Sequence, residues 1–435
     1  MNYDVFLTLL LVFGFVLLVG LRFPITFSML FTAFLFILLS GKLPMRYISQ
    51  TMTSGIANFT ILAVPLFMTA GELMNYSGIT KRLFNFADVL VGHISGGLGH
   101  VNILASLFFG GVSGSAAADC VGLGNIEIKA MKDAGYDADF AVGITAASSI
   151  IGPIFPPSGP MILFGTLASI SVGAMFMGGA TVGVIMTLFL MITVFISCRK
   201  RNYPKRIRAG LKEIFSSFKV SFWALLMPPM LIYCLTSGIV HTTEVGALAV
   251  LYSFFLGFVV YRELKPAVFV NILKKVVETV GMIMMLIAAG QVFAGVLVAQ
   301  RVPDMVGGFL FGLTTNPYIL ILIVIGFLLF LGTFMETTAA VLICIPLMLP
   351  VINMIGMNRV QFGILLIFVL MIGLLTPPMA ICLFITSKIG GIPFMKAFHA
   401  VKIYYIAFII IALLIGFFPV ITLWLPRLIF GASVG

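Results

Sequence analysis

Gly-Pro-Ile-Phe-Pro-Pro-Ser-Gly, residues 152–159, interrupts an otherwise apolar run from about 140 to 170. A related phrase, Gly-Leu-Leu-Thr-Pro-Pro, begins 221 positions later at Gly373 and interrupts a second apolar run. Proline lacks an N–H donor and disfavours helix at the residue before it, so a Pro pair flanked by Gly ends a helix. Each apolar run is therefore predicted to be a helix that is broken near its middle.

The same offset relates a second pair of motifs. Gly-Val-Ser-Gly-Ser-Ala-Ala-Ala-Asp, which begins at Gly111, falls on Gly-Thr-Phe-Met-Glu-Thr-Thr-Ala-Ala, which begins at Gly332. Two features in register in each half indicate an internal repeat. Interrupted helices at corresponding positions of two halves are typical of a transporter's central site, whereas either Pro pair taken alone would also fit a packing kink.

The composition restricts the class of protein. Hydrophobic residues make up 61% of the 435 residues and charged residues only 9%, which excludes a soluble globular protein and predicts a polytopic protein of the lipid bilayer. The net charge of +11 does not indicate nucleic-acid binding, because the basic residues lie in short segments between apolar runs. The five Cys and four His are dispersed without metal-ligand spacing, and no catalytic cluster stands at membrane depth. No enzyme activity is expected.

An all-α fold with about 11 membrane-crossing helices is predicted from segments of about 20 apolar residues. Two pairs of short arms, over about 97–131 and 317–352, fit re-entrant hairpins better than full spans. The interrupted helices cover about 139–170 and 360–389. The other predicted crossings and two amphipathic arms lie near 4–21, 24–40, 57–75, 172–197, 221–240, 243–261, 279–299 and 401–425, and near 78–92 and 263–277.

The basic residues predict the orientation. A first repeat over 1–198, a basic cytoplasmic linker over 199–219 and a second repeat over 220–435 place 20 of the 25 Lys and Arg residues, including Arg22, on the cytoplasmic side. The N-terminus is then predicted to lie on the outer side of the membrane, which is the periplasmic side if the membrane is a bacterial inner membrane. The two halves have opposite orientations, so hairpin one enters from the cytoplasm and hairpin two from the other side. This arrangement is an inverted repeat.

The hairpin tips and the helix breaks carry the candidate transport chemistry. They offer backbone carbonyls and hydroxyls, which hard small cations prefer as ligands, and no Cys or His. Half-helix N-termini at the breaks would attract a substrate carboxylate. One cation site in each half is predicted.

Two acidic residues in the hairpins lie at membrane depth. Glu336 in hairpin two has two roles open to it: handling of an ion, proton or substrate, or a hydrogen bond that stabilises the hairpin. Asp119 in hairpin one has Ala340 as its repeat mate, so its role is asymmetric and a structural role is open. Glu72 ranks lower, because it lies near a predicted helix end.

These motifs, together with the length of the chain, resemble the large membrane subunit of TRAP (tripartite ATP-independent periplasmic) transporters over essentially the whole sequence. The resemblance implies sodium-coupled secondary import of an organic acid, such as a C4-dicarboxylate or sialic acid, across the bacterial inner membrane by an elevator mechanism. It also implies two partners, a separate small four-helix membrane subunit and a periplasmic substrate-binding protein. A stand-alone sodium-coupled carboxylate carrier of similar architecture is the alternative.

The resemblance also implies at least two Na⁺ ions as coupling ions, and it implies which residues bind them and the substrate. One sodium site would use Gly110, Ser113, Gly152, Phe155 and Pro156. The other would use Gly332, Gly373, Thr376 and Met379. The substrate would lie between them, near Ser115, Ser158, Thr333, Glu336, Thr337 and Thr338.

Overall fold

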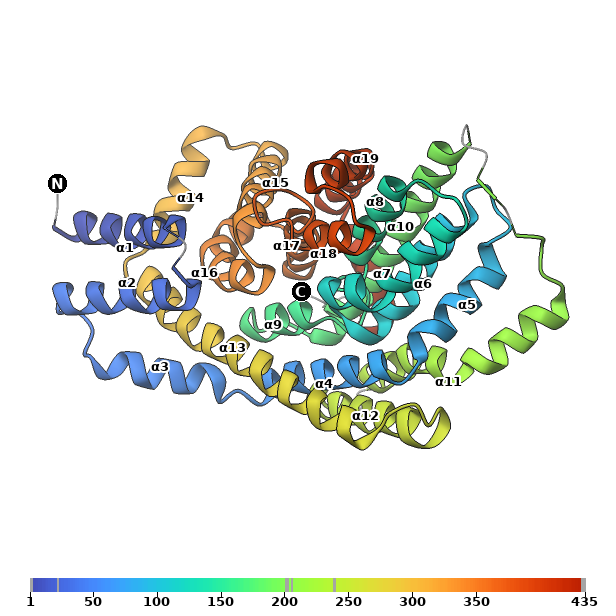
Figure 1. Cartoon of the computed structure of the whole chain (residues 1–435). Coiled ribbons are helices and arrows are strands. Elements are labelled where there is room, and N and C mark those ends of the chain that lie inside the picture. Colours follow the sequence, from blue (N-terminus) through green and yellow to red (C-terminus); the bar gives the residue numbers. More distant parts are fainter. Residues whose placement is uncertain (1–2, 22, 200–202, 205, 238–239, 432–435) are drawn as a thin grey trace.

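The computed structural model describes residues 3–21, 23–199, 203–204, 206–237 and 240–431 (Figure 1). Every regular element among these residues is a helix, so the predicted all-α class is confirmed. Four of the basic residues that predicted the orientation, Arg22, Lys200, Arg201 and Lys205, lie outside the described residues.

Among its described residues, the first half contains ten α-helices and one short 3₁₀ helix. Their bounds are α1 Tyr3–Gly20, α2 Ile25–Ser40, α3 Arg46–Ile56, η1 Phe59–Leu62, α4 Ala63–Tyr76, α5 Ile79–Val91, α6 Gly97–Ser113, α7 Ala116–Asp133, α8 Ala138–Ser149, α9 Gly159–Leu167 and α10 Val172–Cys198. Hairpin one is formed by α6 and α7, and the first interrupted helix by α8 and α9.

The second half repeats this order. Its elements are α11 Leu211–Thr236, α12 Thr242–Phe255, the π-helix η2 Leu256–Val260, α13 Pro266–Ala299, α14 Val302–Leu313, α15 Pro317–Phe334, α16 Thr337–Ile355, α17 Arg359–Gly373, α18 Ile381–Gly390, α19 Phe394–Phe417 and α20 Pro419–Phe430. A shift of 221 positions lays α5 to α10 on α14 to α19 with ends that agree within about three residues, so the repeat seen in two motifs extends over whole helices. Hairpin two is α15 with α16, and the second interrupted helix is α17 with α18.

The halves differ most where α3 and α4 correspond to α13. The first pair is bent by 56° at its break, whereas α13 is continuous, so the arm and crossing predicted separately over 263–277 and 279–299 are one helix. The cause is local. The Asn58 side chain accepts a hydrogen bond from the Thr60 N–H at 2.9 Å and starts a new helix. Its repeat mate, Thr279, donates to the Lys275 carbonyl at 2.9 Å within one helix.

Two other predicted boundaries differ from the structure. The linker predicted over 199–219 is shorter, because α11 begins at Leu211, where a polar but helix-forming sequence follows Gly210. The last crossing, predicted over 401–425, is α19 followed by a separate helix α20. Pro419 explains the separation, since a proline is accommodated in the first turn of a helix but not in its interior.

Seven described helices are long and apolar enough to cross a membrane by themselves, or eight if the bent pair of α3 and α4 counts as one span. The number expected from sequence was about 11, which includes the interrupted helices. The halves of the interrupted helices fall short of the length needed for a span of their own, because each break divides one apolar run in two.

The packing places both hairpins and both breaks together. Helix α18 of the second half packs against α7 and α8 of the first, and α16 packs against α9. On the other side, α13 runs along α2, α3 and α4, while α12 packs against α4. Figure 1 shows α3, α4, α12 and α13 as a layer along one edge, with the hairpins and broken helices above it.

Candidate functional site

The first break lies where hairpin one ends. Helix α8 ends at Ser149 and α9 begins at Gly159, so the Pro pair lies in the non-helical segment between them. A methyl group added to Gly110 at the hairpin tip would lie 2.8 Å from the Gly152 Cα, so the two backbones are in contact. Gly114, with φ +58°, turns the chain between the two arms, a conformation that glycine adopts without strain. The tip of hairpin one therefore rests directly on the break.

The second half repeats this contact. A methyl group added to Gly373 would overlap the Gly332 carbonyl and lie 2.6 Å from the Gly332 Cα. The Met379 N–H donates to the Thr333 carbonyl at 3.1 Å, which ties the break to hairpin two. Both halves thus bring non-helical backbone with free carbonyl groups against a hairpin tip. The two ion sites predicted at these contacts stay a prediction.

Thr376 adds a hydroxyl to the second break. Its Oγ1 donates to the Ile372 carbonyl at 3.0 Å and lies 3.1 Å from the Tyr405 hydroxyl of α19. The Tyr405 hydroxyl in turn donates to the Leu375 carbonyl at 2.7 Å. Tyr405 is therefore a positioning residue at this break, and nothing in its local sequence distinguishes it from other tyrosines in apolar helices.

Ser115 and Glu336 are repeat mates with the same local role. Ser115 caps α7 by accepting a hydrogen bond from the Ala118 N–H at 3.4 Å. Glu336 caps α16 by accepting from the N–H groups of Thr338 at 2.8 Å and Ala339 at 3.2 Å, and from the Thr338 hydroxyl at 2.9 Å. Two roles were left open for Glu336, and these hydrogen bonds are those expected of the second, the stabilisation of the hairpin.

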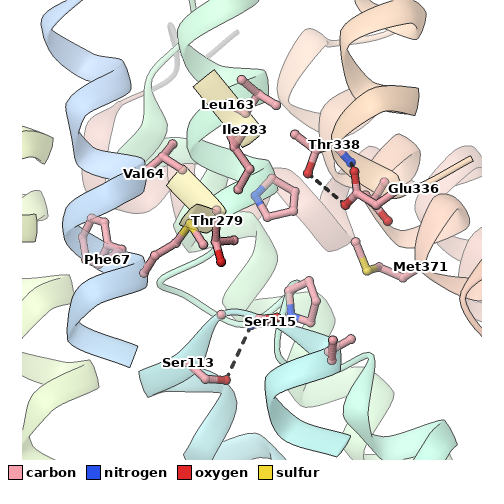
Figure 2. Close-up of a pocket in the computed structure, with 18 of the residues that line it drawn as sticks. Val64, Phe67, Ser113, Ser115, Leu163, Thr279, Ile283, Glu336, Thr338 and Met371 are labelled. Carbon is pink, nitrogen blue, oxygen red and sulfur yellow. Dashed lines mark hydrogen bonds between the residues drawn. The ribbon is translucent and has the colours of Figure 1, made fainter. Parts of the chain in front are cut away.

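A central cavity of about 270 Å³ lies between the two hairpin tips. Figure 2 shows Ser113 and Ser115 of hairpin one on one side and Glu336 and Thr338 of hairpin two on another. Residues of both breaks, among them Pro153, Pro157 and Leu374, complete the wall. The two repeats therefore share one cavity.

The predicted site residues divide into three groups. Ser113, Ser115, Glu336, Thr337 and Thr338 line the cavity. The other sodium candidates lie outside the lining, where tips and breaks touch or beside these contacts: Gly110, Gly152, Phe155, Pro156, Gly332, Gly373, Thr376 and Met379.

The third group is turned away from the cavity. Ser158 is fully buried, donates to the Pro153 carbonyl and caps α9 through the Met161 N–H at 3.3 Å. The Thr333 hydroxyl donates to the Phe330 carbonyl at 2.8 Å within α15. Neither residue is part of the cavity lining, so the structure does not bring them together with the other substrate candidates.

Several lining residues were missed by sequence reasoning. Helix α4 contributes Val64, Phe67 and Met68, and α13 contributes Thr279 and Ile283 (Figure 2). They are mostly apolar residues in apolar helices, so no local pattern separates them from lipid-facing or core residues. Only the packing of α4 and α13 beside the hairpins assigns them to the site.

A second cavity of about 420 Å³ adjoins the first and shares Met68, Ser113, Ser115, Ala117 and Thr279 with it. It contains an ion pair between α13 and α4, in which Lys275 Nζ lies 2.8 Å and 3.0 Å from the two carboxylate oxygens of Glu72. Among the described residues, Lys275 is the only Lys or Arg that lines either cavity. A carboxylate that leaves the central cavity by this route would meet one cationic group.

The donor set fits small hard cations rather than transition metals. Within the described part of the chain, no group of three or more His, Cys, Asp or Glu side chains is close enough to hold a metal ion. Backbone carbonyls and hydroxyls remain, which are ligands of Na⁺-like cations. Thr337 Oγ1 is buried and has no hydrogen-bond partner among the described residues, which leaves it available to a ligand.

Comparisons with known proteins agree with this architecture. The chain is 43% identical over 420 residues to the sialic acid TRAP transporter large permease protein SiaM of Vibrio cholerae, covering 97% of this chain and 98% of that one. It is 36% identical over 420 residues to the sialic acid TRAP transporter permease protein SiaT of Haemophilus influenzae, covering 97% of this chain and 68% of that one.

A solved transporter shares the fold. The crystal structure of the Alcanivorax borkumensis YdaH transporter superposes with a TM-score of 0.61 over 90% of each chain at 13% sequence identity. Residues 12–421 match the family described as "Tripartite ATP-independent periplasmic transporter, DctM component". The chain, with its repeated hairpins and breaks around one cavity, therefore belongs to the DctM family, the large permease subunits of TRAP transporters.

Proposed function

We propose that this permease subunit couples the import of an organic acid, of the sialic acid class, to the entry of at least two Na⁺ ions. The observation that carries the proposal is the convergence of both hairpin tips and both breaks on one cavity. The similarity to two sialic acid permease proteins favours that substrate over a C4-dicarboxylate. The periplasmic N-terminus is part of the same proposal and rests on the distribution of basic residues. The bacterial inner membrane is also part of it and rests on the membership of the DctM family.

The proposed transport cycle is an elevator motion. Helices α6 to α9 and α15 to α18 interlock, since α18 packs against α7 and α8, and α16 against α9. This group would move as one body against the layer of α3, α4, α12 and α13. The cavity lies between the two groups, so such a motion would carry the substrate site relative to the membrane. The Lys275–Glu72 pair would then meet the acid on its way out through the second cavity.

Two partners complete the proposal: a small four-helix membrane subunit and a periplasmic binding protein that delivers the acid. The test is uptake of labelled sialic acid into proteoliposomes that contain this chain and the small subunit. The sodium gradient and the binding protein are each present or absent, and succinate replaces sialic acid in a parallel series. Uptake of sialic acid is expected only when the sodium gradient and the binding protein are both present. Uptake without the binding protein would support the stand-alone carrier, and uptake of succinate alone would reassign the substrate.

Thr376→Val is expected to weaken the response to sodium. The substitution removes the hydroxyl at the second break, and hydrogen bonds or ligands to a charged group contribute about 1.5–3 kcal/mol. The sodium concentration for half-maximal uptake should therefore rise about tenfold or more, because each 1.4 kcal/mol corresponds to a factor of ten. The measurement is a sodium titration of uptake in the same proteoliposomes.

The matched control is Thr193→Val. Thr193 Oγ1 in α10 also donates to the carbonyl four residues earlier, at 2.8 Å, but it lies away from both breaks. It should leave the sodium titration unchanged. An unchanged titration for Thr376→Val as well would remove Thr376 from the sodium site.

A further inference from the structure

Hairpin one encloses a set of polar side chains that the proposed transport site does not use. Asp119 and Glu127 of α7 are each 1% exposed, as buried as the apolar core around them. Neither lines either of the two cavities described above. Ionisable groups buried at membrane depth are costly, so two in one hairpin call for a function or a compensating partner.

A chain of hydrogen bonds through the side chains of Ser106, Ser148 and Asn102 connects the neighbourhood of Asp119 to Glu127. The Ser106 hydroxyl donates to Ser148 Oγ at 3.1 Å, and Ser148 donates to Asn102 Oδ1 at 2.6 Å. The amide group of Asn102 then donates to Glu127 Oε2 at 2.7 Å. Ser148 Oγ also lies 3.2 Å from the Thr145 carbonyl, which is a second acceptor for its hydrogen.

Asp119 lies at the open end of this chain. Neither of its carboxyl oxygens makes a hydrogen bond to a described residue, although Ser106 lies beside it. Burying an ionised carboxylate without a cation paired to it costs free energy, and Asp119 is 1% exposed. The burial therefore suits Asp119 with a proton bound.

The second repeat shows that the fold does not need this polar chain. At the positions 221 residues later, Asn102, Ser106 and Asp119 correspond to Ile323, Phe327 and Ala340. Glu127 and Ser148 correspond to Met348 and Val369. The same hairpin and broken helix form around these five apolar residues. A purely structural role for the chain is thus disfavoured by the protein's own second half.

No cation among the described residues forms an ion pair with Asp119. Helix α7 packs against α5, α6, α8 and α18. The titratable groups that interact with Asp119 are the Cys120 thiol and the Glu127 carboxyl group, and neither is a cation. The Cys382 thiol interacts with that of Cys120. The other charged or titratable groups on these helices either have another partner or are exposed. Those with another partner are His100 with the Ser95 carbonyl, Asp139 with the Phe140 N–H, Arg82 with Glu263, Asp88 with Arg206, and Lys132 with the Gly390 carbonyl. The exposed ones are Lys81, Lys129, Asp133 and Lys388. A proton is the remaining species that can neutralise Asp119.

We propose that Asp119 is a proton-binding site and that Na⁺ binding at the tip of hairpin one displaces this proton. The Asp119 N–H donates to the Ser115 carbonyl at 3.0 Å, so Asp119 lies one helical turn from the tip. A cation at the tip would stabilise the ionised carboxylate through a medium of low dielectric constant. The exchange is balanced: one Na⁺ binds, the Asp119 O–H bond breaks, and one H⁺ leaves. The hydrogen-bonded chain leads toward Glu127, about 12 Å further along α7.

This inference rests on the proposed sodium site in hairpin one and adds a reciprocal linkage. If Na⁺ displaces a proton, protons must weaken Na⁺ binding by the same factor. Raising the pH should therefore tighten Na⁺ binding. The linkage would also place part of the pH response of transport in the first repeat alone, because the second repeat has Ala340 at the position of Asp119.

The test measures protons released when NaCl is added to the purified complex in weakly buffered detergent with a pH-sensitive dye, with KCl as the reference salt. Wild-type protein is expected to release about one proton per chain, since cation binding to a protonated site releases protons. Asp119→Asn should release none. Glu127→Gln, the matched control in the same helix, should release as much as wild type.

A second measurement follows Na⁺-induced thermal stabilisation between pH 6 and pH 8. The half-saturating Na⁺ concentration of wild type should fall at least about fivefold as the pH rises, a typical coupling. It should not change with pH in Asp119→Asn. Ser106→Ala keeps the carboxyl group but removes the neighbouring hydroxyl, which favours the ionised form. It should release its proton at higher pH than wild type and serves if Asp119→Asn does not fold.

The outcomes separate the two proposals. Stabilisation by Na⁺ without proton release in wild type would overturn the Asp119 inference and leave the sodium site standing. Release that is lost in Glu127→Gln but kept in Asp119→Asn would move the proton to Glu127 and overturn the assignment. Absence of any Na⁺ stabilisation would overturn both.

Discussion

Gly373→Ala is expected to reduce sodium-driven uptake at least about tenfold, because overpacking of this kind costs about 1–3 kcal/mol or more where nothing can move aside. The added methyl group would overlap the Gly332 carbonyl, which is backbone and has no rotamer to change. The second break and hairpin two would have to separate. Since the proposed sodium ligands come from both, sodium should no longer stabilise this site.

The measurement is uptake at saturating sodium, together with the sodium-induced rise in melting temperature. Gly326→Ala is the matched control, because Gly326 lies in α15 of the same hairpin and an added methyl group there meets nothing within 4 Å. It should behave as wild type. Wild-type uptake by Gly373→Ala would show that the contact between tip and break is not needed for transport.

Glu336→Ala is expected to have the second large effect, again at least about tenfold on uptake, because two part-buried N–H groups would be left without an acceptor, and a buried one costs about 1–3 kcal/mol. Glu336 holds the first turn of α16 through Thr338 and Ala339, and it lines the cavity. Loss of this cap would loosen the tip of hairpin two where substrate and Na⁺ are proposed to bind. Loss of an N-cap alone destabilises a helix by about 0.5–2 kcal/mol.

Glu336→Ser distinguishes the two roles that the sequence left open. Serine is the residue at the repeat mate, Ser115, where it caps α7. If capping is the role of Glu336, as the hydrogen bonds favour, Glu336→Ser should keep uptake within about threefold of wild type, since Ser is among the most preferred N-cap residues. If Glu336→Ser is as inactive as Glu336→Ala, the carboxylate itself handles an ion, proton or substrate. Uptake is compared at equal amounts of protein in the liposomes.

The repeat and its breaks could be predicted from sequence because they depend on local backbone chemistry. Proline removes a hydrogen-bond donor wherever it stands, and glycine permits a turn such as that at Gly114, so both act independently of the rest of the fold. The contacts of Gly110 with Gly152 and of Gly332 with Gly373 follow the motifs that the sequence placed in register. Breaks of this kind survive in any packing arrangement.

Other features depended on single residues whose effect the sequence pattern does not reveal. Asn58 caps a new helix, while its mate Thr279 continues one, so a bent pair in one half corresponds to the straight α13 in the other. Both residues have similar polarity and low helix propensity. Hydrophobic periodicity therefore predicted two segments, 263–277 and 279–299, where the structure has the single helix α13.

By itself, the sequence determined that the protein is an all-α membrane protein built from two related halves, each with a hairpin and a helix broken by glycine and proline. Only the tertiary structure decided which side chains face the cavity: Ser115 and Thr337 do, whereas Ser158 and Thr333 hydrogen-bond to nearby backbone carbonyls. It also brought Lys275 to Glu72 and Ser106 to Ser148. The physical reason is that helix breaks arise from covalent properties of individual residues, whereas the direction a side chain faces depends on helices far away in the sequence that pack beside it.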